Sequence, residues 1–329
     1  MKVLVTGCAG FIGFHVCKKL LERGDTVIGL DNVNRYYDTD LKKNRLKLLK
    51  KISEKRKNQY TFFRIDISNK NKIKKVFTRY KFDRVIHLAA QAGVRYSIKN
   101  PDLYVKSNQV GFFNIIDLTC RFKVPHFVYA SSSSVYGDNS KMPFSEKSNT
   151  DYPRQIYAAT KKSNELLAYS YSSLYKLKTT GLRFFTVYGP WGRPDMALFK
   201  FTKNILKRKK IKVFNKGNHK RDFTYIDDAV NLTLLSSDKI SNFNKNKTPF
   251  RIFNVGSNSP IKLKKFVNII EKILKIKSIK KMLPLQKGDM INTYSNSSKI
   301  FKEFNYSIKS NHFINISKFI FWYKNYYSK

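Results

Sequence analysis

The sequence predicts an α/β fold built on a doubly wound parallel sheet, with a smaller mixed α/β lobe in its C-terminal part. Short apolar runs alternate with helical patterns from residue 2 to about residue 189, and a glycine-rich turn joins the first of these strands to the first helix. After "GPWGRP" (189–194) the alternation becomes irregular. We therefore expect a first domain over residues 1–187, a return of the chain to it within about 220–257, and a lobe over 188–329.

The N-terminal elements define a compact strand–helix–strand unit. Residues 2–7, "KVLVTG", form a β-branched run that ends in glycine, which is typical of a buried strand. Residues 11–24 have apolar side chains at helical spacing and a glycine stop, and residues 26–31 form the second strand. Such a unit predicts a parallel pair with a right-handed crossover.

The following elements repeat this alternation. The lysine-rich stretch 44–59 is expected to be a helix or loop with a solvated face, and residues 60–67 and 82–90 the third and fourth strands. A helical pattern over 101–122 leads to a fifth strand at 126–134. The helix that carries Tyr157 precedes a sixth strand at 179–189, and the buried run 250–257 suggests the return to the first domain.

The chain is strongly basic, with 65 Lys and Arg against 22 Asp and Glu, a formal net charge of +43. This excess favours a nucleic-acid or acidic-membrane partner. The basic residues are scattered, however, and the abundant Lys, Asn, Ile, Phe and Tyr share A/T-rich codons, so compositional drift also explains the charge. Because no DNA- or RNA-binding motif accompanies it, we do not expect nucleic-acid binding. A nucleic-acid-binding protein on an inactive scaffold remains the alternative from another class.

Cysteine usage and hydropathy favour the cytoplasm. Cys8, Cys17 and Cys120 have no metal-ligand spacing and cannot all pair, which fits a reducing compartment and a protein without a metal site. The 42% hydrophobic fraction suffices for a packed core, yet no apolar run approaches the length of a membrane span. We therefore expect a cytoplasmic protein that does not enter a membrane.

The turn "GCAGFIG" (7–13) has the properties of a dinucleotide-binding loop. Gly7, Gly10 and Gly13 permit a tight turn and a close approach of the backbone to a pyrophosphate at the helix N-terminus. Asp31, at the end of the second strand, can accept hydrogen bonds from an adenosine ribose and would repel a 2′-phosphate. This context favours NAD over NADP as cofactor.

The glycine spacing resembles that of extended short-chain dehydrogenases/reductases, which have a Rossmann fold. In that family a Tyr-x-x-x-Lys pair follows the glycines, with a serine or threonine about 25 positions before the tyrosine; Tyr157, Lys161 and Ser132 match this pattern. A tyrosine with a pKa near ~10 is a poor base at neutral pH, and an adjacent ammonium favours its phenolate. The resemblance therefore implies that Tyr157 exchanges a proton with a sugar hydroxyl while Lys161 and Ser132 assist.

Longer segments of the sequence narrow the resemblance to one group of enzymes within this family. "LDNVNRYYD" (30–38), "YASSSSVYG" (129–137), "LRFFTVYGPWGRPDMALF" (182–199) and "RDFTYIDD" (221–228) closely resemble UDP-glucuronate 4-epimerases of the NAD-dependent epimerase/dehydratase family, and the likeness continues to "PLQKGD" (284–289) and "WYKNYY" (322–327). It implies reversible inversion at C4 of UDP-glucuronate, giving UDP-galacturonate, through a transient 4-keto sugar. The cofactor-binding residues it implies are Gly7, Gly10, Phe11, Ile12, Gly13, Asp31, Asn32, Asp66, Ile67, Leu88, Ala89, Ala90, Tyr157 and Lys161.

The resemblance also implies a sugar site and a dimer. The substrate-binding residues would be Ser133, Ser134, Thr186, Arg193, Arg221, Gln286 and Asp289. The helices near 101–122 and 157–175 would pair into a four-helix bundle across a two-fold axis, with an apolar surface that includes Phe112, Phe113, Leu166, Leu167, Tyr171 and Leu174.

Two other reactions remain open on the same scaffold. UDP-glucuronate decarboxylases resemble this chain but have glutamate just before the Val-Tyr-Gly of the fifth strand, where this chain has Ser134. A serine can donate a hydrogen bond to the sugar carboxylate, whereas an ionised glutamate would repel it. The second alternative is 4-epimerisation of neutral UDP-hexoses.

Overall fold

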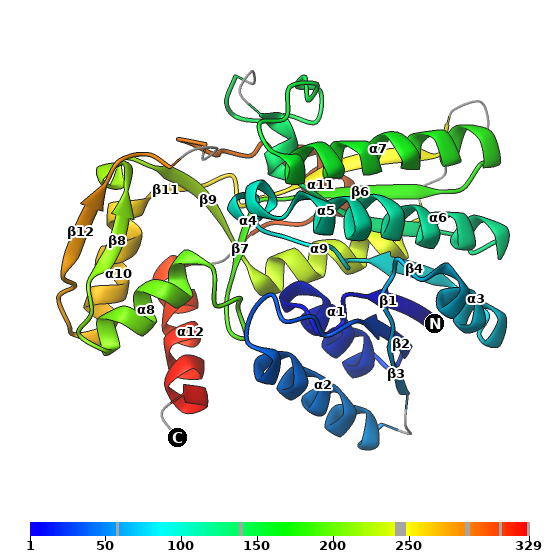
Figure 1. The fold of residues 1–329 in the computed structure, drawn as a ribbon, viewed down its shortest axis with the longest axis horizontal. Helices are drawn as coiled ribbons and strands as arrows, with labels where there is room; N and C mark the ends of the chain where they lie inside the picture. The colour runs from blue at the N-terminus through cyan, green and yellow to red at the C-terminus, as the bar shows by residue number, and fades with distance from the viewer. Residues whose placement is uncertain (57–58, 138–140, 241–247, 287–289, 309–310, 328–329) are drawn as a thin grey trace.

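The computed structural model describes residues 1–329 except 57–58, 138–140, 241–247, 287–289, 309–310 and 328–329 (Figure 1). Its centre is a seven-stranded sheet in the order β10-β6-β5-β4-β1-β2-β3, and every neighbouring pair in it is parallel. The strands are β1 (Lys2–Thr6), β2 (Thr26–Asp31), β3 (Tyr60–Arg64), β4 (Arg84–His87), β5 (Phe127–Ser132), β6 (Thr179–Phe184) and β10 (Phe250–Val255).

Helices cover both faces of this sheet, because its strands are apolar on both sides. Val3 and Val5 of β1 pack with α1 (Phe11–Glu22), α2 (Thr39–Glu54) and α9 (Ile226–Asp238). Leu4, between them, points the other way, into a core shared with α3 (Lys70–Arg79), α6 (Gly111–Arg121) and α7 (Ile156–Tyr175). The predicted doubly wound α/β fold is confirmed, and residues 44–54 of the lysine-rich stretch belong to helix α2.

The chain leaves the large sheet earlier than the sequence predicts. The expected strand over 179–189 is divided: β6 ends at Phe184, opposite the last residue of β5, Ser132. The next three residues form β7 (Thr186–Tyr188), which pairs with β9 (Lys220–Tyr225) in a second sheet completed by β11 (Pro260–Lys262). Thr186 therefore lies beside the end of the large sheet and outside it.

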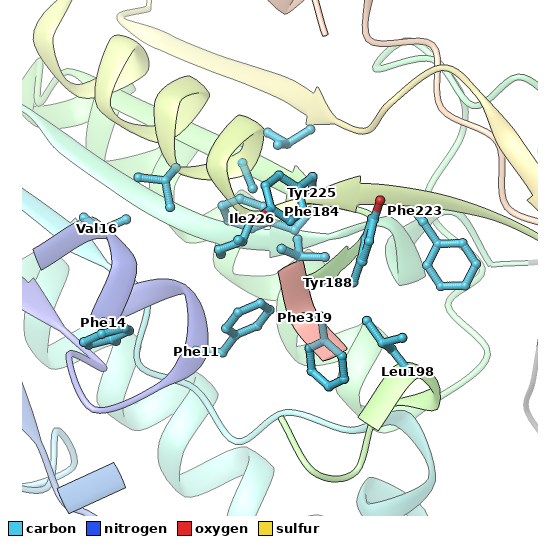
Figure 2. Close-up of a cluster of buried hydrophobic side chains, with 14 of the residues drawn as sticks. Phe11, Phe14, Val16, Phe184, Tyr188, Leu198, Phe223, Tyr225, Ile226 and Phe319 are labelled. Atoms are coloured by element: carbon cyan, nitrogen blue, oxygen red, sulfur yellow. The ribbon is translucent and has the colours of Figure 1, made fainter. Parts of the chain in front are cut away.

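Most of the C-terminal part packs around this second sheet, whereas its helix α11 (Ser298–Phe304) contacts β10 and α9. It contains α8 (Ala197–Leu206), α10 (Leu263–Leu274), α11 (Ser298–Phe304), α12 (His312–Tyr327) and a parallel pair, β8 (Ile211–Phe214) with β12 (Lys280–Leu283). Figure 2 shows that Phe11 of α1, Ile226 of α9 and Phe319 of α12 belong to one buried cluster. The two parts of the chain therefore share one hydrophobic core. Within the described residues, no helix is long and apolar enough to cross a membrane.

Buried histidines make the stability of this fold dependent on pH. Burial lowers the pKa of His15, His87 and His126 from 6.5 to about 3. Between these two values the unfolded chain binds more protons than the folded chain, so the free energy of unfolding decreases as pH falls below about 6.5. Going from pH 7 to pH 5 should cost about 2 kcal/mol for each such histidine.

His126 offers a direct test of this expectation. Its Nε2 lies 2.8 Å from Thr180 Oγ1, a contact that a glutamine amide can replace without titrating. In urea titrations, His126→Gln should lose about 2 kcal/mol less stability between pH 7 and pH 5 than the unaltered chain. Equal losses in the two proteins would contradict a neutral, buried His126.

Candidate functional site

The main cavity opens at the carboxyl ends of the central strands, where the order of the sheet reverses between β1 and β4. Ligands of open α/β sheets bind at this switch point. The cavity is lined by every predicted cofactor-binding residue except Asp66, namely Gly7, Gly10, Phe11, Ile12, Gly13, Asp31, Asn32, Ile67, Leu88, Ala89, Ala90, Tyr157 and Lys161. Asp66 lies behind them and accepts a hydrogen bond from the Asn32 amide at 2.9 Å.

The glycine turn leaves space that side chains would fill. Gly7 has φ +75°, and a Cβ there would lie 2.7 Å from the Ala89 nitrogen. A Cβ on Gly13 would lie 2.1 Å from the Gly7 carbonyl oxygen. Gly10 caps α1 without a side chain, and no acidic residue lies in the first turn of α1, so the helix N-terminus presents free N–H groups and a positive dipole end. These features fit the pyrophosphate of NAD.

The adenosine side of the cavity contains Asp31 together with a buried cation. The Asp31 carboxylate accepts hydrogen bonds from the backbone N–H groups of Ala9 (3.1 Å) and Val33 (2.7 Å). Lys42 Nζ donates to the carbonyl (2.8 Å) and side-chain oxygen (2.7 Å) of Asn34, and burial lowers the pKa of Lys42 to about 8. Sequence reasoning missed Lys42, because nothing in a lysine-rich region distinguishes the one that turns inward.

Arg45, one turn later on α2, connects the two sides of the cavity. Its buried guanidinium donates to the carbonyls of Ala9 (2.8 Å), in the glycine turn, and of Trp191 (2.5 Å). Trp191 lies two residues before Arg193, whose side chain lines the cavity. Arg45 therefore fixes the spacing between the glycine turn and the loop that carries Arg193.

Tyr157, Lys161 and Ser132 meet at the floor of the cavity. Tyr157 lies in the first turn of α7 and Ser132 ends β5; their hydroxyls are hydrogen-bonded. Burial raises the pKa of the Tyr157 phenol, and the Ser132 hydrogen bond and the charge of Arg193 oppose that rise. Lys161 Nζ donates to the Ala130 carbonyl at 2.8 Å, and burial lowers its pKa to about 8. The structure thus brings together the three residues that the sequence singled out.

An asparagine that sequence reasoning missed supports this group. The pattern over 101–122 is not one regular helix, because residues Val105–Val110 form a π-helical turn before α6. In this turn Asn108 bonds both the N–H (2.8 Å) and the carbonyl (3.0 Å) of Gln91, and its amide donates to Thr160 Oγ1 (3.1 Å). Thr160 in turn donates to the Tyr157 carbonyl at 2.9 Å. Apolar periodicity does not distinguish a π turn from an α-helix, so no feature of the sequence points to Asn108.

Arg193 and Thr186 lie where the cavity meets the second sheet. Both line a smaller apolar hollow beside the main cavity, together with Phe11 and Phe319. The Arg193 guanidinium is paired with Asp195, with Nε 3.0 Å from Oδ1, and Tyr36 donates to the same carboxylate at 3.1 Å. An anion that binds Arg193 therefore meets a guanidinium already oriented by a carboxylate.

Ser133 and Ser134 occupy a single 3₁₀ turn directly after β5, over Ser133–Tyr136. The Ser134 hydroxyl donates to Ser132 Oγ at 2.9 Å, and its backbone N–H lies 3.2 Å from the same oxygen. Neither residue lines the main cavity in this structure. Ser134 therefore contacts the proposed reaction centre through Ser132.

Two of the remaining predicted substrate residues, Arg221 and Gln286, do not line the cavity. Arg221 donates to the carbonyls of Met290 (2.5 Å) and Ile291 (2.7 Å), so it fastens the segment that follows residue 289. Gln286 has a buried Oε1 atom without a hydrogen-bond partner among the described residues. Asp289 lies outside the described residues. The roles of these three residues stay predictions.

Comparisons with known proteins agree with this geometry. Residues 3–256 match the model of the NAD dependent epimerase/dehydratase family. The chain belongs to this family. Its relatives in the family include Protein CapI of Staphylococcus aureus, 47% identical over 100% of both chains, and UDP-glucuronate 4-epimerase 5 of Arabidopsis thaliana, 48% identical over 100% of this chain and 76% of the plant protein.

A solved structure of the family has the same fold throughout. The crystal structure of UDP-glucuronic acid 4-epimerase from Bacillus cereus, in complex with UDP-glucuronic acid and NAD, superimposes with a TM-score of 0.90 at 31% sequence identity. The match covers 99% of this chain and 100% of that one. Within the described part of this chain, no group of three or more His, Cys, Asp or Glu side chains could hold a metal ion.

Proposed function

We propose that the chain is an NAD-dependent UDP-glucuronate 4-epimerase, which interconverts UDP-glucuronate and UDP-galacturonate through a 4-keto sugar. The observation that carries the proposal is the meeting of Tyr157, Lys161 and Ser132 at the floor of a cavity whose other end has the glycine turn and Asp31. Relatives named for this reaction are up to 48% identical over the full chain. Bound NAD would supply the acceptor and donor of the C4 hydride.

Each of the three residues has a defined task in this proposal. As a phenolate, Tyr157 would accept the proton of the C4 hydroxyl while the hydride leaves, and the resulting phenol would return that proton after the keto sugar has turned over. Lys161 stabilises the phenolate and holds the nicotinamide ribose, and the Ser132 hydroxyl orients the proton between phenol and sugar. All three side chains line the cavity, which supports these roles.

We assign the sugar nucleotide to the side of the cavity that adjoins the second sheet. Arg193 there suits a diphosphate, because a guanidinium binds phosphate oxygens bidentately. Arg221, Gln286 and Asp289 would complete the nucleotide site, and Thr186 with Ser133 and Ser134 would hold the sugar carboxylate. The sugar lobe would comprise residues 188–329 and the cofactor domain 1–187, with a return within about 220–257.

Product analysis tests the proposed reaction against its rivals. Purified protein incubated with UDP-glucuronate, and its products separated by anion-exchange chromatography, should yield UDP-galacturonate without release of carbon dioxide. A UDP-pentose product would favour the decarboxylase. Turnover of UDP-glucose with none of UDP-glucuronate would favour a neutral-sugar epimerase. Salt-sensitive DNA binding without turnover would favour the nucleic-acid alternative.

Hydrogen bonds from neutral hydroxyl groups would explain why the sugar keeps its carboxylate while C4 is a ketone. Decarboxylation needs the breaking C–C bond roughly perpendicular to the ketone plane, and hydrogen bonds from Thr186 and Ser134 would hold the carboxylate away from that direction. Each such bond to a charged group contributes ~1.5–3 kcal/mol, or about one to two decades in rate. Thr186→Ala and Ser134→Ala should therefore divert some flux from UDP-galacturonate to carbon dioxide and a UDP-4-keto-pentose, and the hydride taken from C4 would remain as NADH, visible as rising absorbance in the near ultraviolet.

The two variants differ in a way that sharpens this test. The Ser134 hydroxyl has one proton and donates it to Ser132 in this structure, so it would have to turn to reach the carboxylate. Ser134→Ala should therefore slow epimerisation as well, whereas Thr186→Ala should mainly redirect the product. Loss of activity in both variants without any carbon dioxide would contradict this account of the carboxylate.

We also propose a homodimer through a four-helix bundle of α6 and α7. On these helices Phe113 is 40% exposed, Leu166 57% and Leu174 72%, so apolar side chains on both helices are available to a partner. Phe112, by contrast, is fully buried in the chain's own core, and Leu167 and Tyr171 pack partly against it. The apolar surface available for dimerisation is therefore smaller than the sequence predicted.

The dimer is tested by light scattering at micromolar concentration. The unaltered chain should have twice the monomer mass, and Leu166→Glu with Leu174→Glu should reduce it to a monomer, because the charges would be buried in the bundle. The same exchange at exposed Ile314, on α12, should leave the mass unchanged. A monomeric unaltered chain would contradict the proposal.

A cytoplasmic location is proposed from the three cysteines, which are all free thiols.

A further inference from the structure

A third residue of α7 continues the spacing of the proposed catalytic pair. Tyr157, Lys161 and Glu165 follow one another at intervals of four residues, so they lie on one face of the helix. Each contacts one of the last three residues of β5. Tyr157 bonds the Ser132 hydroxyl, and Lys161 donates to the Ala130 carbonyl at 2.8 Å; both contacts belong to the proposed mechanism. Glu165 accepts a hydrogen bond from the Ser131 hydroxyl at 2.6 Å.

Glu165 is held by a buried ion pair with Arg183 of β6. Two parallel bonds of 2.8 Å join them, Nε to Oε1 and Nη2 to Oε2, and the side chains are only 3% and 4% exposed. Arg183 lies beside Ser131 in the register of β5 and β6, so the carboxylate rests on two adjacent strands. Arg183 also donates to the Tyr136 hydroxyl at 3.0 Å, in the turn that begins at Ser133.

The burial of this pair needs an explanation other than stability. Removing two charges from water costs as much as their attraction returns, so a well-packed apolar pair would serve stability equally well. An ion pair with directional hydrogen bonds does more than an apolar contact, because it fixes the register between the elements that it joins. Here those elements are α7, which carries Tyr157 and Lys161, and the end of β5, which carries Ser132.

We propose that Glu165 is a positioning residue for the reaction: through Ser131 and Arg183 it fixes α7 against the end of β5, and it places a carboxylate one turn from Lys161 on the face of α7 that carries Tyr157. The inference rests on the proposed function for its catalytic meaning. Its structural content, a carboxylate that acts on Lys161, is independent of which sugar is turned over.

The charges around Lys161 make this effect measurable. Burial lowers the pKa of Lys161 to about 8, and Glu165 on the next turn of α7 opposes that shift. His87 on β4 also faces Lys161, but burial lowers its pKa to about 3, so it is neutral at working pH. Burial raises the pKa of Tyr157 on α7, so its phenol is uncharged in the resting state, and Arg183 on β6 bonds both oxygens of the Glu165 carboxylate. Glu165 is therefore the anion that acts on Lys161.

Glu165→Gln isolates the charge, because the amide oxygen still accepts from Ser131. We expect the alkaline limb of the kcat–pH profile to move about one pH unit lower, so that kcat above the limb falls about tenfold while KM changes little. The control Glu54→Gln removes an exposed carboxylate at the end of α2 and should leave the profile unchanged. A variant merely weakened in stability would lose activity at all pH values alike.

Two further measurements keep the test decisive. If Glu165→Gln folds poorly because Arg183 is left unpaired, Glu165→Gln with Arg183→Met removes both buried charges and should shift the profile in the same direction. Independently of turnover, the Lys161 signal can be followed across pH by NMR of chain with ¹³C-labelled lysine side chains, assigned with Lys161→Arg. Its midpoint should fall in both Glu165 variants.

The outcomes separate the inference from the proposed function. An unaltered chain that does not convert UDP-glucuronate would refute the proposed function, and the NMR titration would still decide the role of Glu165. A folded Glu165 variant whose Lys161 midpoint and pH profile both match the unaltered chain would overturn the inference.

Discussion

Tyr157→Phe is expected to lower the rate of UDP-glucuronate epimerisation about 10²- to 10⁴-fold, the usual contribution of a positioned acid–base group. The substitution removes the phenolic oxygen that bonds Ser132 and keeps the ring, which packs edge-on against Tyr104 with centroids 6.0 Å apart. The cavity should therefore keep its shape and its affinity for NAD. The rate is measured by chromatography of the products, and bound NAD is measured after heat release from the purified protein.

A matched control lies on the same helix. Tyr169 is half exposed on the outer surface of α7, away from the cavity, so Tyr169→Phe removes the same oxygen from the same element. It should leave the rate within a factor of about two, as most surface exchanges change little. Near-normal epimerisation by Tyr157→Phe would remove Tyr157 from the reaction, whatever the control shows.

Gly13→Ala is expected to abolish cofactor binding and to lower stability severely. The added Cβ would lie 2.1 Å from the Gly7 carbonyl oxygen and 3.2 Å from the Cys8 Cα, both of them backbone atoms that cannot rotate away. Relief requires α1 to move away from the glycine turn, which displaces the N–H groups that face the pyrophosphate. Overpacking of this kind costs about 1–3 kcal/mol or more, and the protein should be purified without NAD.

A second glycine provides the control for this exchange. Gly24 ends the α1 region with φ +90°, and nothing lies within 4 Å of the position of its Cβ. Gly24→Asn, a residue that tolerates positive φ, should therefore retain NAD and lose little stability. Thermal unfolding and the ratio of absorbance at 260 and 280 nm measure both properties. Full NAD occupancy in Gly13→Ala would contradict the placement of the cofactor at this turn.

The order of the elements in the first part of the chain could be predicted because each strand and helix has its own apolar period. The division at Phe184 could not, because "TTGLRFFTVYG" is one continuous apolar run. Only the pairing of Phe184 with the last residue of β5, and of Thr186 with Phe223, shows where one sheet ends and the next begins. Such pairing depends on distant residues that local periodicity does not contain.

Some residues of the candidate site could likewise be predicted from the sequence, and others could not. Gly7, Tyr157 and Lys161 could be found from spacing, because the chemistry needs these residue types at fixed intervals within one turn or one helix. Lys42 and Arg45 could not, since Lys42 bonds Asn34 in the loop after β2 and Arg45 bonds the distant Trp191 carbonyl, contacts that spacing does not reveal. The net charge of +43 conceals such residues further, because in a lysine-rich chain an inward-facing cation has no distinctive sequence.

The measurement that tests the central claim most directly is the fate of deuterium at C4. The account requires the C4 hydrogen to leave as hydride and to return to the other face of the same sugar without exchange with water. Purified protein incubated with UDP-glucuronate deuterated at C4, in ordinary water, should therefore give UDP-galacturonate that retains deuterium at C4, observed by NMR and mass spectrometry. UDP-galacturonate with hydrogen at C4, or no UDP-galacturonate at all, would contradict the account.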